Sequence, residues 1–519
     1  MLLNTKDPFD LKAIKTYYLL IVSLLFFSVL IILSGCKQTS HEKICIQAVD
    51  NLPHELIPGV YHSYSEMQIY SQVYEPLLQL SDDYKTILPN LAESWSYSSG
   101  NLHLTIRLKP DIIFHDQRRL DSRAAIHCIE WIQRTCPESL YLSNIDSVFI
   151  LDSLTFRMVL KKPDARFLYF LTTGYGIVLF SPHDTGSAHD QHVSFPAGTG
   201  PFRVKTRKDD RIILQKFGLY RNSSGNMAEL VFRLFPYSAQ LEKALERGEI
   251  DMVYMVRQYA LDRLRWSGKI GYIVNEPLHC NMIAFNLKHP KLSDPLLRKR
   301  ILTAIDLKRL TIYHNRGAAI TATNPLPPVY KYFKDIKQAA YDSLIHSRLT
   351  KEKRDSVIHL TLYYPEYSFI RPTYLEAIKS YLEKRQIYLD VVYFTSSKTY
   401  EQAIRRDDAE LFFYGWRSDI LGDAGNYLWS LFYSDSPYNL FNYRNSSVDR
   451  QLEKALNEFD NKKRNQYYRA VVEEIVGDMP AIFLKYIKEY YAYNSIKIRA
   501  LSMTPYGIIN SKDVIINDE

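Results

Sequence analysis

VIHLTLYYPEYSFIRPTYLEAIKSYLEKRQIYLDVVYFTSSKTYEQAIRRDDAELFFYGW, residues 357–416, alternates between two kinds of pattern. The apolar runs VIHLTLYYP, IYLDVVYF and ELFFYGW predict strands, and the segments 374–384 and 399–406 between them predict helices. Strands that alternate with helices are typical of an α/β lobe with a partly parallel sheet. The sequence therefore predicts an α/β fold for this part of the chain.

The whole chain has 519 residues, which is too long for one ordinary core, so two or more lobes are expected. Before residue 200 we predict a helix from Ser65, with Ser65 as N-cap, a strand at 102–108, a helix at 122–134 and a hairpin at 144–159. The Gly- and Pro-rich cluster 197–201 indicates a crossing between lobes.

Further along, the predicted elements include a strand at 281–286, one helix from Asp294 to about Asn315, helices at 447–459 and 462–477, and a final strand at 481–485 that leads to an irregular tail.

The net charge of +8 is spread along the chain without a short Lys/Arg cluster. A nucleic-acid-binding protein normally concentrates its basic residues on one face or segment. Nucleic acid is therefore not an expected partner, and the charge is interpreted as diffuse surface charge.

The N-terminus carries the clearest targeting signal. The uncharged segment TYYLLIVSLLFFSVLIILSG, residues 16–35, follows Lys12 and Lys15 and ends directly before Cys36. Small residues before a cysteine at the end of an export signal resemble the bacterial lipoprotein cleavage box, which implies cleavage before Cys36 and acylation of Cys36. The alternative is an uncleaved membrane anchor, because twenty apolar residues can span a bilayer. Both interpretations place residues 37–519 outside the inner membrane.

Neither a metal site nor a catalytic site stands out. Apart from Cys36, the cysteines lack the CxxC spacing of metal ligands. Cys128 and Cys136 lie about 12 Å apart on one predicted helix, too far for a disulfide unless the helix breaks before Pro137. The nucleophile, phosphate-binding and zinc-protease motifs are absent. His127 and Glu130 lie three residues apart, but a solvated helix face explains them better than a metal site. We therefore expect a binding protein, not an enzyme, without a cofactor or metal.

Asp419 is the residue that raises a functional question, because it lies in the largely apolar segment FFYGWRSDILGDAGNYLWSLF, residues 412–432. A turn or a helix N-cap would explain the acid. A carboxylate that waits for a ligand cation would explain it as well.

Several stretches in order resemble the peptide-binding proteins of bacterial ABC importers, the solute-binding family that includes the oligopeptide- and dipeptide-binding proteins. The resemblance covers nearly all of the mature chain. It rests on 74–116, Gly198 to Phe202, Gly248 to Asp251, Phe285 and Asn286, Asp294 and Pro295 with Arg298, Gly415 and Trp416 with Asp419, Asn442 and Tyr443, Val448 and Asp449, and Met479 and Pro480.

The resemblance implies two α/β lobes that close over a ligand. Its expected domains are a lipoprotein signal peptide (1–35), a lipidated cysteine with a tether (36–43), lobe one (44–80, 196–275 and 490–519), an extra subdomain of lobe one (81–195) and lobe two (276–489).

The resemblance also implies a set of ligand-binding residues. Asp419 would meet the free α-ammonium of a peptide, and main-chain groups near Gly415 and Arg417 would pair with the peptide backbone. Trp416, Tyr414 and Tyr64 would line side-chain pockets, and Asn439 belongs to the expected ligand-binding residues. Phe413 stands where some relatives carry an arginine for the ligand carboxylate, so Arg371 and Arg417 are the alternative candidates.

The expected function is capture of short peptides with free N-termini and their delivery to an ABC permease by a lipid-anchored, extracytoplasmic monomer. Alternatives within the family are a murein peptide, glutathione, haem or a nickel chelate. Because no histidine precedes or follows the Gly-Trp-x-x-Asp segment closely, the sequence disfavours haem and nickel. An envelope or host-interaction protein without a transport role is the alternative outside the family's function.

Overall fold

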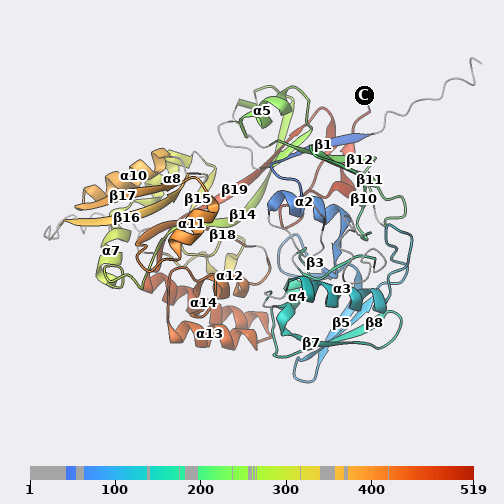
Figure 1. Cartoon of the computed structure of the whole chain (residues 1–519), viewed down its shortest axis with the longest axis horizontal. Helices are drawn as coiled ribbons and strands as arrows, with labels where there is room; N and C mark the ends of the chain where they lie inside the picture. The colour runs from blue at the N-terminus through green and yellow to red at the C-terminus, as the bar shows by residue number, and fades with distance from the viewer. Residues whose placement is uncertain are drawn as a thin grey trace, which may run out of the picture. The chain divides into compact units, whose positions relative to one another are not determined.

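Two long antiparallel strands, β14 (Ile270–Phe285) and β19 (Ala481–Asn494), run through the middle of the largest sheet (Figure 1). Their pairing shifts register between Asn275 and His279, so the strands are irregular at this point. The computed structural model describes residues 43–53, 56, 63–136, 139, 141–174, 176–181, 197–221, 223–235, 238–254, 260, 263–264, 266–315, 317–338, 357–366, 372–418 and 420–518. Residues from Ile44 onward form one compact unit.

Eleven strands of the described residues make up this sheet. In spatial order they are β10 (Phe202–Lys208), β11 (Arg211–Lys216), β12 (Glu229–Leu234), β1 (Ile44–Val49), β13 (Met252–Tyr254), β19, β14, β18 (Leu411–Arg417), β16 (Ile358–Pro365) and β17 (Ile387–Phe394), while β15 (Ala319–Thr321) pairs with β19. Strand β1 is parallel to both β12 and β13, and β16 is parallel to both β17 and β18. The sheet is therefore mixed.

The alternation predicted for residues 357–416 is confirmed. Helices α10 (Pro372–Glu383) and α11 (Ser397–Ile404) connect β16, β17 and β18 as the pattern indicated. The apolar faces of these strands and of α10 form one core cluster with α7 (Pro295–Ala304) and α8 (Leu307–Asn315). Burial of these faces is what fixes the side of the sheet that each residue occupies.

Smaller sheets lie outside the large one. The segment before residue 200 forms a sheet of β5 (Ala92–Ser98), β6 (His103–Leu108), β8 (Thr155–Leu160) and β7 (Ile145–Ile150), which α3 (Ser122–Thr135) contacts. The two-stranded sheets are β2 (Glu75–Pro76) with β9 (Val178–Leu179), β3 (Leu78–Leu80) with β4 (Ile87–Pro89), and β20 (Ile498–Ala500) with β21 (Ile515–Ile516).

The remaining helices of the described residues are mostly short. They are α2 (Tyr64–Val73), α4 (Phe167–Phe170), α5 (Ser238–Glu246), α12 (Gly425–Phe432), α13 (Ser446–Leu456) and α14 (Asn461–Asp478), with 3-10 turns at Leu142–Asn144, Lys331–Phe333 and Ser511–Asp513. Helices α12, α13 and α14 pack against one another, as Figure 1 shows.

Four predicted boundaries are wrong. Ser63 caps α2, not Ser65, because its hydroxyl accepts the Glu66 backbone N–H. The strand expected at 281–286 is the end of the much longer β14, and the strand expected at 481–485 continues to Asn494 as β19. The single helix expected at 294–315 breaks at Ile305, which has extended backbone angles.

Several residues that carry the family resemblance hold the fold. The Asn286 amide donates to the carbonyl oxygens of Asp407 and Ala409, at 3.1 and 2.8 Å. The Arg298 guanidinium donates to the carbonyl oxygens of Leu292 and Asp478, both at 2.8 Å, and so satisfies the end of α14. These residues connect separate segments, which gives them a structural reason for their place in the pattern.

Candidate functional site

Gly415, Trp416 and Arg417 form the end of β18, where the strand pairs with β14. The register places Gly415 opposite Asn281, Trp416 opposite Cys280 and Arg417 opposite His279. The run LFFYGWR supplies the aromatic and apolar residues that favour a strand, and it pairs with the buried half of β14. The predicted binding strand is therefore a strand of the large sheet, held between β14 and β16.

Gly415 leaves room for a histidine. A Cβ at Gly415 would lie 2.4 Å from Nε2 of His279 and 3.2 Å from Oδ1 of Asn281, so a larger residue would require the His279 side chain to shift. The expectation that no histidine lies near the Gly-Trp-x-x-Asp segment is therefore wrong, because strand pairing brings His279 there from a distant part of the chain. Burial lowers the pKa of His279 to about 4, so its ring is neutral at neutral pH.

Arg417 is held by three groups from other parts of the chain. Its Nε donates to the Glu489 carboxylate at 3.3 Å, its terminal nitrogen donates to the Tyr506 carbonyl oxygen at 2.9 Å, and its guanidinium carbon lies 4.8 Å from the centre of the Tyr64 ring. Glu489 lies on β19, Tyr64 begins α2 and Tyr506 belongs to the C-terminal tail. Arg417 therefore joins four segments, and its charge already has a buried carboxylate partner.

Tyr64 is the second predicted site residue in this cluster. Its ring stacks on Tyr254 with centroids 4.0 Å apart, and its hydroxyl donates to the Gly507 carbonyl oxygen. Burial raises the pKa of Tyr64, so the hydroxyl stays protonated and acts as a donor. The structure thus brings Tyr64 and Arg417 together, with Tyr64 serving the packing of α2 against the tail.

Trp416 lies among aromatic rings. Its centroid is 6.1 Å from that of Tyr414 and 5.4 Å from that of Tyr438. The next residue, Asn439, is almost fully buried, and its amide donates to the carbonyl oxygens of Tyr433 and Tyr443 at 3.1 and 2.8 Å. The Asn439 side chain therefore closes its own loop, and its predicted contact with a ligand stays a prediction.

Asp419, Arg371 and Cys36 lie outside the described residues, so their roles stay predictions. The residues on either side of Asp419 are anchored. Ser418 donates its backbone N–H to the Leu278 carbonyl oxygen at 2.8 Å, and the Ile420 carbonyl oxygen accepts the Tyr330 hydroxyl at 3.3 Å.

Sequence reasoning missed Glu489 and Tyr506. Glu489 is 2% exposed, and a single acid within the aromatic run YIKEYYAYN is the signal that could have identified a buried charge. Its Oε2 has no hydrogen-bond partner among the described residues. Tyr506 offered no signal, because it contributes its backbone carbonyl oxygen to Arg417.

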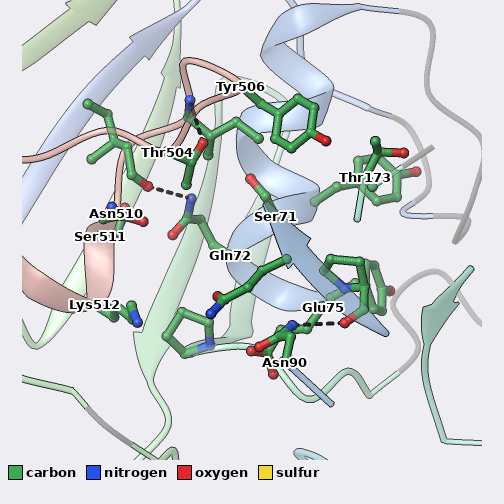
Figure 2. Close-up of a pocket in the computed structure, with 18 of the residues that line it drawn as sticks. Ser71, Gln72, Glu75, Asn90, Thr173, Thr504, Tyr506, Asn510, Ser511 and Lys512 are labelled. Atoms are coloured by element: carbon green, nitrogen blue, oxygen red, sulfur yellow. Dashed lines mark hydrogen bonds between the residues drawn. The ribbon is translucent and has the colours of Figure 1, made fainter. Parts of the chain in front are cut away.

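A cavity of about 280 Å³ is lined by the Tyr506 side chain, whose backbone carbonyl oxygen accepts from Arg417. Helix α2 forms its back wall, the tail around Asn510 forms one side and Thr173 lies on the opposite side (Figure 2). The Tyr506 hydroxyl lies 2.6 Å from Oγ1 of Thr172 at its edge. None of the lining residues lies between 276 and 489, so the cavity is separate from β18.

In the described part of the chain, no group of three His, Cys, Asp or Glu side chains is placed to hold a metal ion. The four cysteines of this part, Cys45, Cys128, Cys136 and Cys280, form no disulfide. Within the described residues, no helix has the length and apolar character needed to cross a bilayer.

The chain matches a known protein family. The family model for bacterial extracellular solute-binding proteins, family 5 (middle), matches residues 86–439. Heme-binding protein A of Haemophilus influenzae is 24% identical over 88% of this chain and 88% of its own length. The peptide transport periplasmic protein SapA of Salmonella typhimurium is 24% identical over 84% of this chain and 85% of its own length.

Solved structures give the same fold. The periplasmic binding protein DppA of Helicobacter pylori, in complex with the peptide STSA, superposes with a TM-score of 0.74 at 22% identity, over 92% of this chain and 98% of that protein. Matches of this kind confirm the predicted α/β fold of two-lobed periplasmic binding proteins.

Proposed function

Since the chain belongs to family 5 of the bacterial extracellular solute-binding proteins, we propose that it captures short peptides with free N-termini and delivers them to an ABC permease. The observation that carries the proposal is the position of Gly415 and Trp416 at the end of β18, shortly before Asp419 in the sequence. The peptide-binding title of a relative with the same fold, the DppA protein of Helicobacter pylori, supports the ligand class.

In this proposal the ligand's ammonium is the cation that Asp419 requires. Water is excluded when a binding protein closes over its ligand, and a carboxylate in such a site needs a charged partner. Main-chain groups of β18 near Gly415 would pair with the peptide backbone, which permits many side chains at each position. Binding and transport account for these features without a reaction, so the protein acts as a binding protein and not as an enzyme.

The C-terminal carboxylate of the peptide needs a cationic partner in the protein, and Arg371 and Arg417 are the two candidates. Arg417 is engaged by Glu489 at 3.3 Å, so a ligand carboxylate would have to compete with a buried internal carboxylate. We therefore favour Arg371 over Arg417 as the partner of the ligand carboxylate. The lipid anchor at Cys36 and the extracytoplasmic location belong to the same proposal and would hold the protein beside its permease.

Haem is the second candidate ligand, and one observation favours it. Heme-binding protein A is similar over 88% of this chain, and His279, whose absence from the site had counted against haem, lies against Gly415. An imidazole is a common haem ligand, and His279 is only partly buried on β14, where its lowered pKa keeps the ring neutral at neutral pH.

The first experiment identifies the bound ligand directly. Residues 37–519 are purified without refolding and denatured, and released small molecules are identified by mass spectrometry. Peptides with unblocked N-termini support the proposal, and haem or another non-peptide ligand contradicts it.

The second experiment tests Asp419 by calorimetry with a peptide identified in this way. Asp419→Ala is expected to lose about 2–5 kcal/mol of binding free energy, because the ligand's ammonium loses its partner. The N-acetylated form of the same peptide should bind the wild-type protein equally weakly. Asp390→Asn, on the exposed side of β17, is the matched control. Equal affinity of Asp419→Ala and wild type rules out the Asp419 contact.

A further inference from the structure

The cavity beside Tyr506 is lined by residues that have no role in the proposed peptide site. Its walls come from α2, the segment 75–90, the residues around Thr173 and the tail from Thr504 to Asp513. All of these residues fall in the segments predicted for lobe one and its extra subdomain. The predicted peptide-binding residues on β18 do not contribute to it.

Two hydrogen-bond donors on the tail side have no partner among the described residues. Ser511 is 2% exposed, and its Oγ has no hydrogen-bond partner among the described residues. A buried hydroxyl without a partner is energetically unfavourable, so a ligand that accepts from it gains affinity. The next residue, Lys512, is partly buried and its Nζ forms no ion pair with a described residue. Figure 2 places Ser511 and Lys512 together on one wall of the cavity.

Among the described residues, none of the acids that line the cavity forms an ion pair with Lys512. Both oxygens of Glu75 accept from the Arg221 guanidinium, at 2.8 and 3.0 Å. The Asp513 carboxylate accepts the Ser224 hydroxyl at 2.7 Å, and Asp82 is exposed. The wall formed by Ser511 and Lys512 therefore offers a neutral donor and a cation to the same ligand group, a combination that suits an anion.

The rest of the lining is mixed, with an apolar part beside amides such as Gln72, Asn90 and Asn510. Met67 and Tyr70 of α2, with Ile508 of the tail and Val178 of β9, supply buried hydrophobic surface. The other hydroxyls are engaged within the protein, since Ser71 donates to the Met67 carbonyl oxygen and Thr173 to the Phe170 carbonyl oxygen. A ligand of this cavity would have one acidic group and one apolar body.

We propose that this cavity is a second ligand site, which binds a small carboxylic acid with an apolar tail. The carboxylate accepts from the Ser511 hydroxyl and pairs with the Lys512 ammonium, and the tail packs on Met67, Tyr70 and Ile508. Tyr506 separates this site from Arg417, because its side chain lines the cavity and its carbonyl oxygen accepts from the guanidinium. The protein thus carries a carboxylate site next to, and distinct from, its peptide site.

The test uses 4-methylpentanoate as the probe and 4-methylpentanamide as its neutral control. Isothermal titration calorimetry is run on residues 44–519, which form one compact unit. We expect wild type to bind the acid and not the amide. Lys512→Gln should weaken binding of the acid about tenfold or more, because a charged hydrogen bond is lost, and Lys512→Arg should largely restore it. Lys299→Gln, which removes an exposed lysine of α7, is the matched control and should bind like wild type.

A peptide-site variant separates the two proposals. Asp419→Ala should bind 4-methylpentanoate like wild type, whatever its effect on peptide binding. Three results overturn the second site: no binding of the acid to wild type, equal binding of acid and amide, or unchanged binding to Lys512→Gln. Loss of the probe in Asp419→Ala also overturns it, because the probe would then occupy the peptide site.

Discussion

The Nε of Arg417 lies 3.3 Å from Oε1 of Glu489, and the Glu489 side chain is 2% exposed. The two residues belong to β18 and β19, which do not pair with each other because β14 lies between them. Burial of a carboxylate is costly unless a cation accompanies it. Arg417 is therefore the counter-ion of Glu489 in this structure, and this role comes before any contact with a ligand.

Removal of Arg417 alone should destabilise the protein strongly. Arg417→Met leaves Glu489 buried without its cation, and we expect a loss of about 3–5 kcal/mol in the free energy of unfolding. The double variant Arg417→Met with Glu489→Gln should recover much of this loss, because no buried charge remains. Urea unfolding followed by circular dichroism measures both. If the single and the double variants lose the same free energy, the charge of Glu489 is not what Arg417 balances.

Gly415→Ala should disturb the strand without changing any charge. The new methyl group would lie 2.4 Å from Nε2 of His279, and crowding of this kind costs about 1–3 kcal/mol. The double variant Gly415→Ala with His279→Ala should regain stability, since the smaller side chain makes room. Thermal unfolding and peptide affinity are the measurements.

The matched control for this prediction is Gly218→Ala, because a Cβ at Gly218 meets nothing within 4 Å. It should unfold at the temperature of the wild-type protein. A Gly415→Ala protein that is as stable as the Gly218→Ala protein would mean that His279 moves aside freely.

Regular patterns in the sequence were enough to predict the β16–β18 region and the hairpin of β7 and β8. Each of these strands has an apolar face that must be buried, and that requirement is visible as alternation. Strand β19 was predicted too short because Lys485, Lys488 and Glu489 interrupt its pattern. The structure pairs Glu489 with Arg417 and places the Lys485 ammonium 2.8 Å from Oδ1 of Asn315. These partners lie far away in the sequence, so local patterns carry no information about them.

The candidate site was predicted only in part, because some of its contacts join residues that are far apart in the sequence. Gly415, Trp416 and Tyr64 were identified from a family pattern, and the structure joins Tyr64 to this strand through Arg417. His279 escaped notice because its contact with Gly415 depends on the pairing of β14 with β18. Strand register is set by three-dimensional pairing, and nothing near residue 279 in the sequence announces it.

A second buried ion pair holds the C-terminal helices. Oδ2 of Asp423 lies 2.6 Å from Nε of Arg464 on α14, and Oδ1 of Asp423 accepts the Tyr468 hydroxyl at 2.8 Å. Both charged side chains are 3% exposed, so solvent screens the pair little. Asp423→Asn should lower the free energy of unfolding by about 3–5 kcal/mol, because Arg464 is left buried without a carboxylate.

The control for this pair is a surface pair of similar geometry. Asp210 and Arg211 lie 2.7 Å apart but are largely exposed, so Asp210→Asn should leave stability unchanged within error. Urea unfolding compares the two variants. Equal effects of Asp423→Asn and Asp210→Asn would contradict the idea that burial makes the Asp423 pair important.

His115 makes stability depend on pH. Its Nε2 lies 2.9 Å from the Gly200 carbonyl oxygen, and burial lowers its pKa to about 4 even though this hydrogen bond acts in the opposite direction. In the unfolded chain a histidine has a pKa of about 6.5, so between these values the unfolded state binds a proton that the folded state does not. The contribution of neutral His115 is therefore fully present above about pH 6.5 and is lost as the pH falls towards 4.

His115→Gln should remove this dependence. A difference of about two and a half pKa units corresponds to roughly 3 kcal/mol, so wild type should lose up to about this amount more than the variant between about pH 7 and about pH 4. His279 has a pKa lowered to about 4 by burial as well, and it should supply a similar slope that remains in His115→Gln and disappears only when both histidines are replaced. Urea unfolding at several pH values measures the slope, and proton NMR of the imidazoles checks the assignment. Equal slopes for wild type and His115→Gln, or an imidazole of His115 that titrates near pH 6.5, would show that the ring is solvated and not held neutral against Gly200.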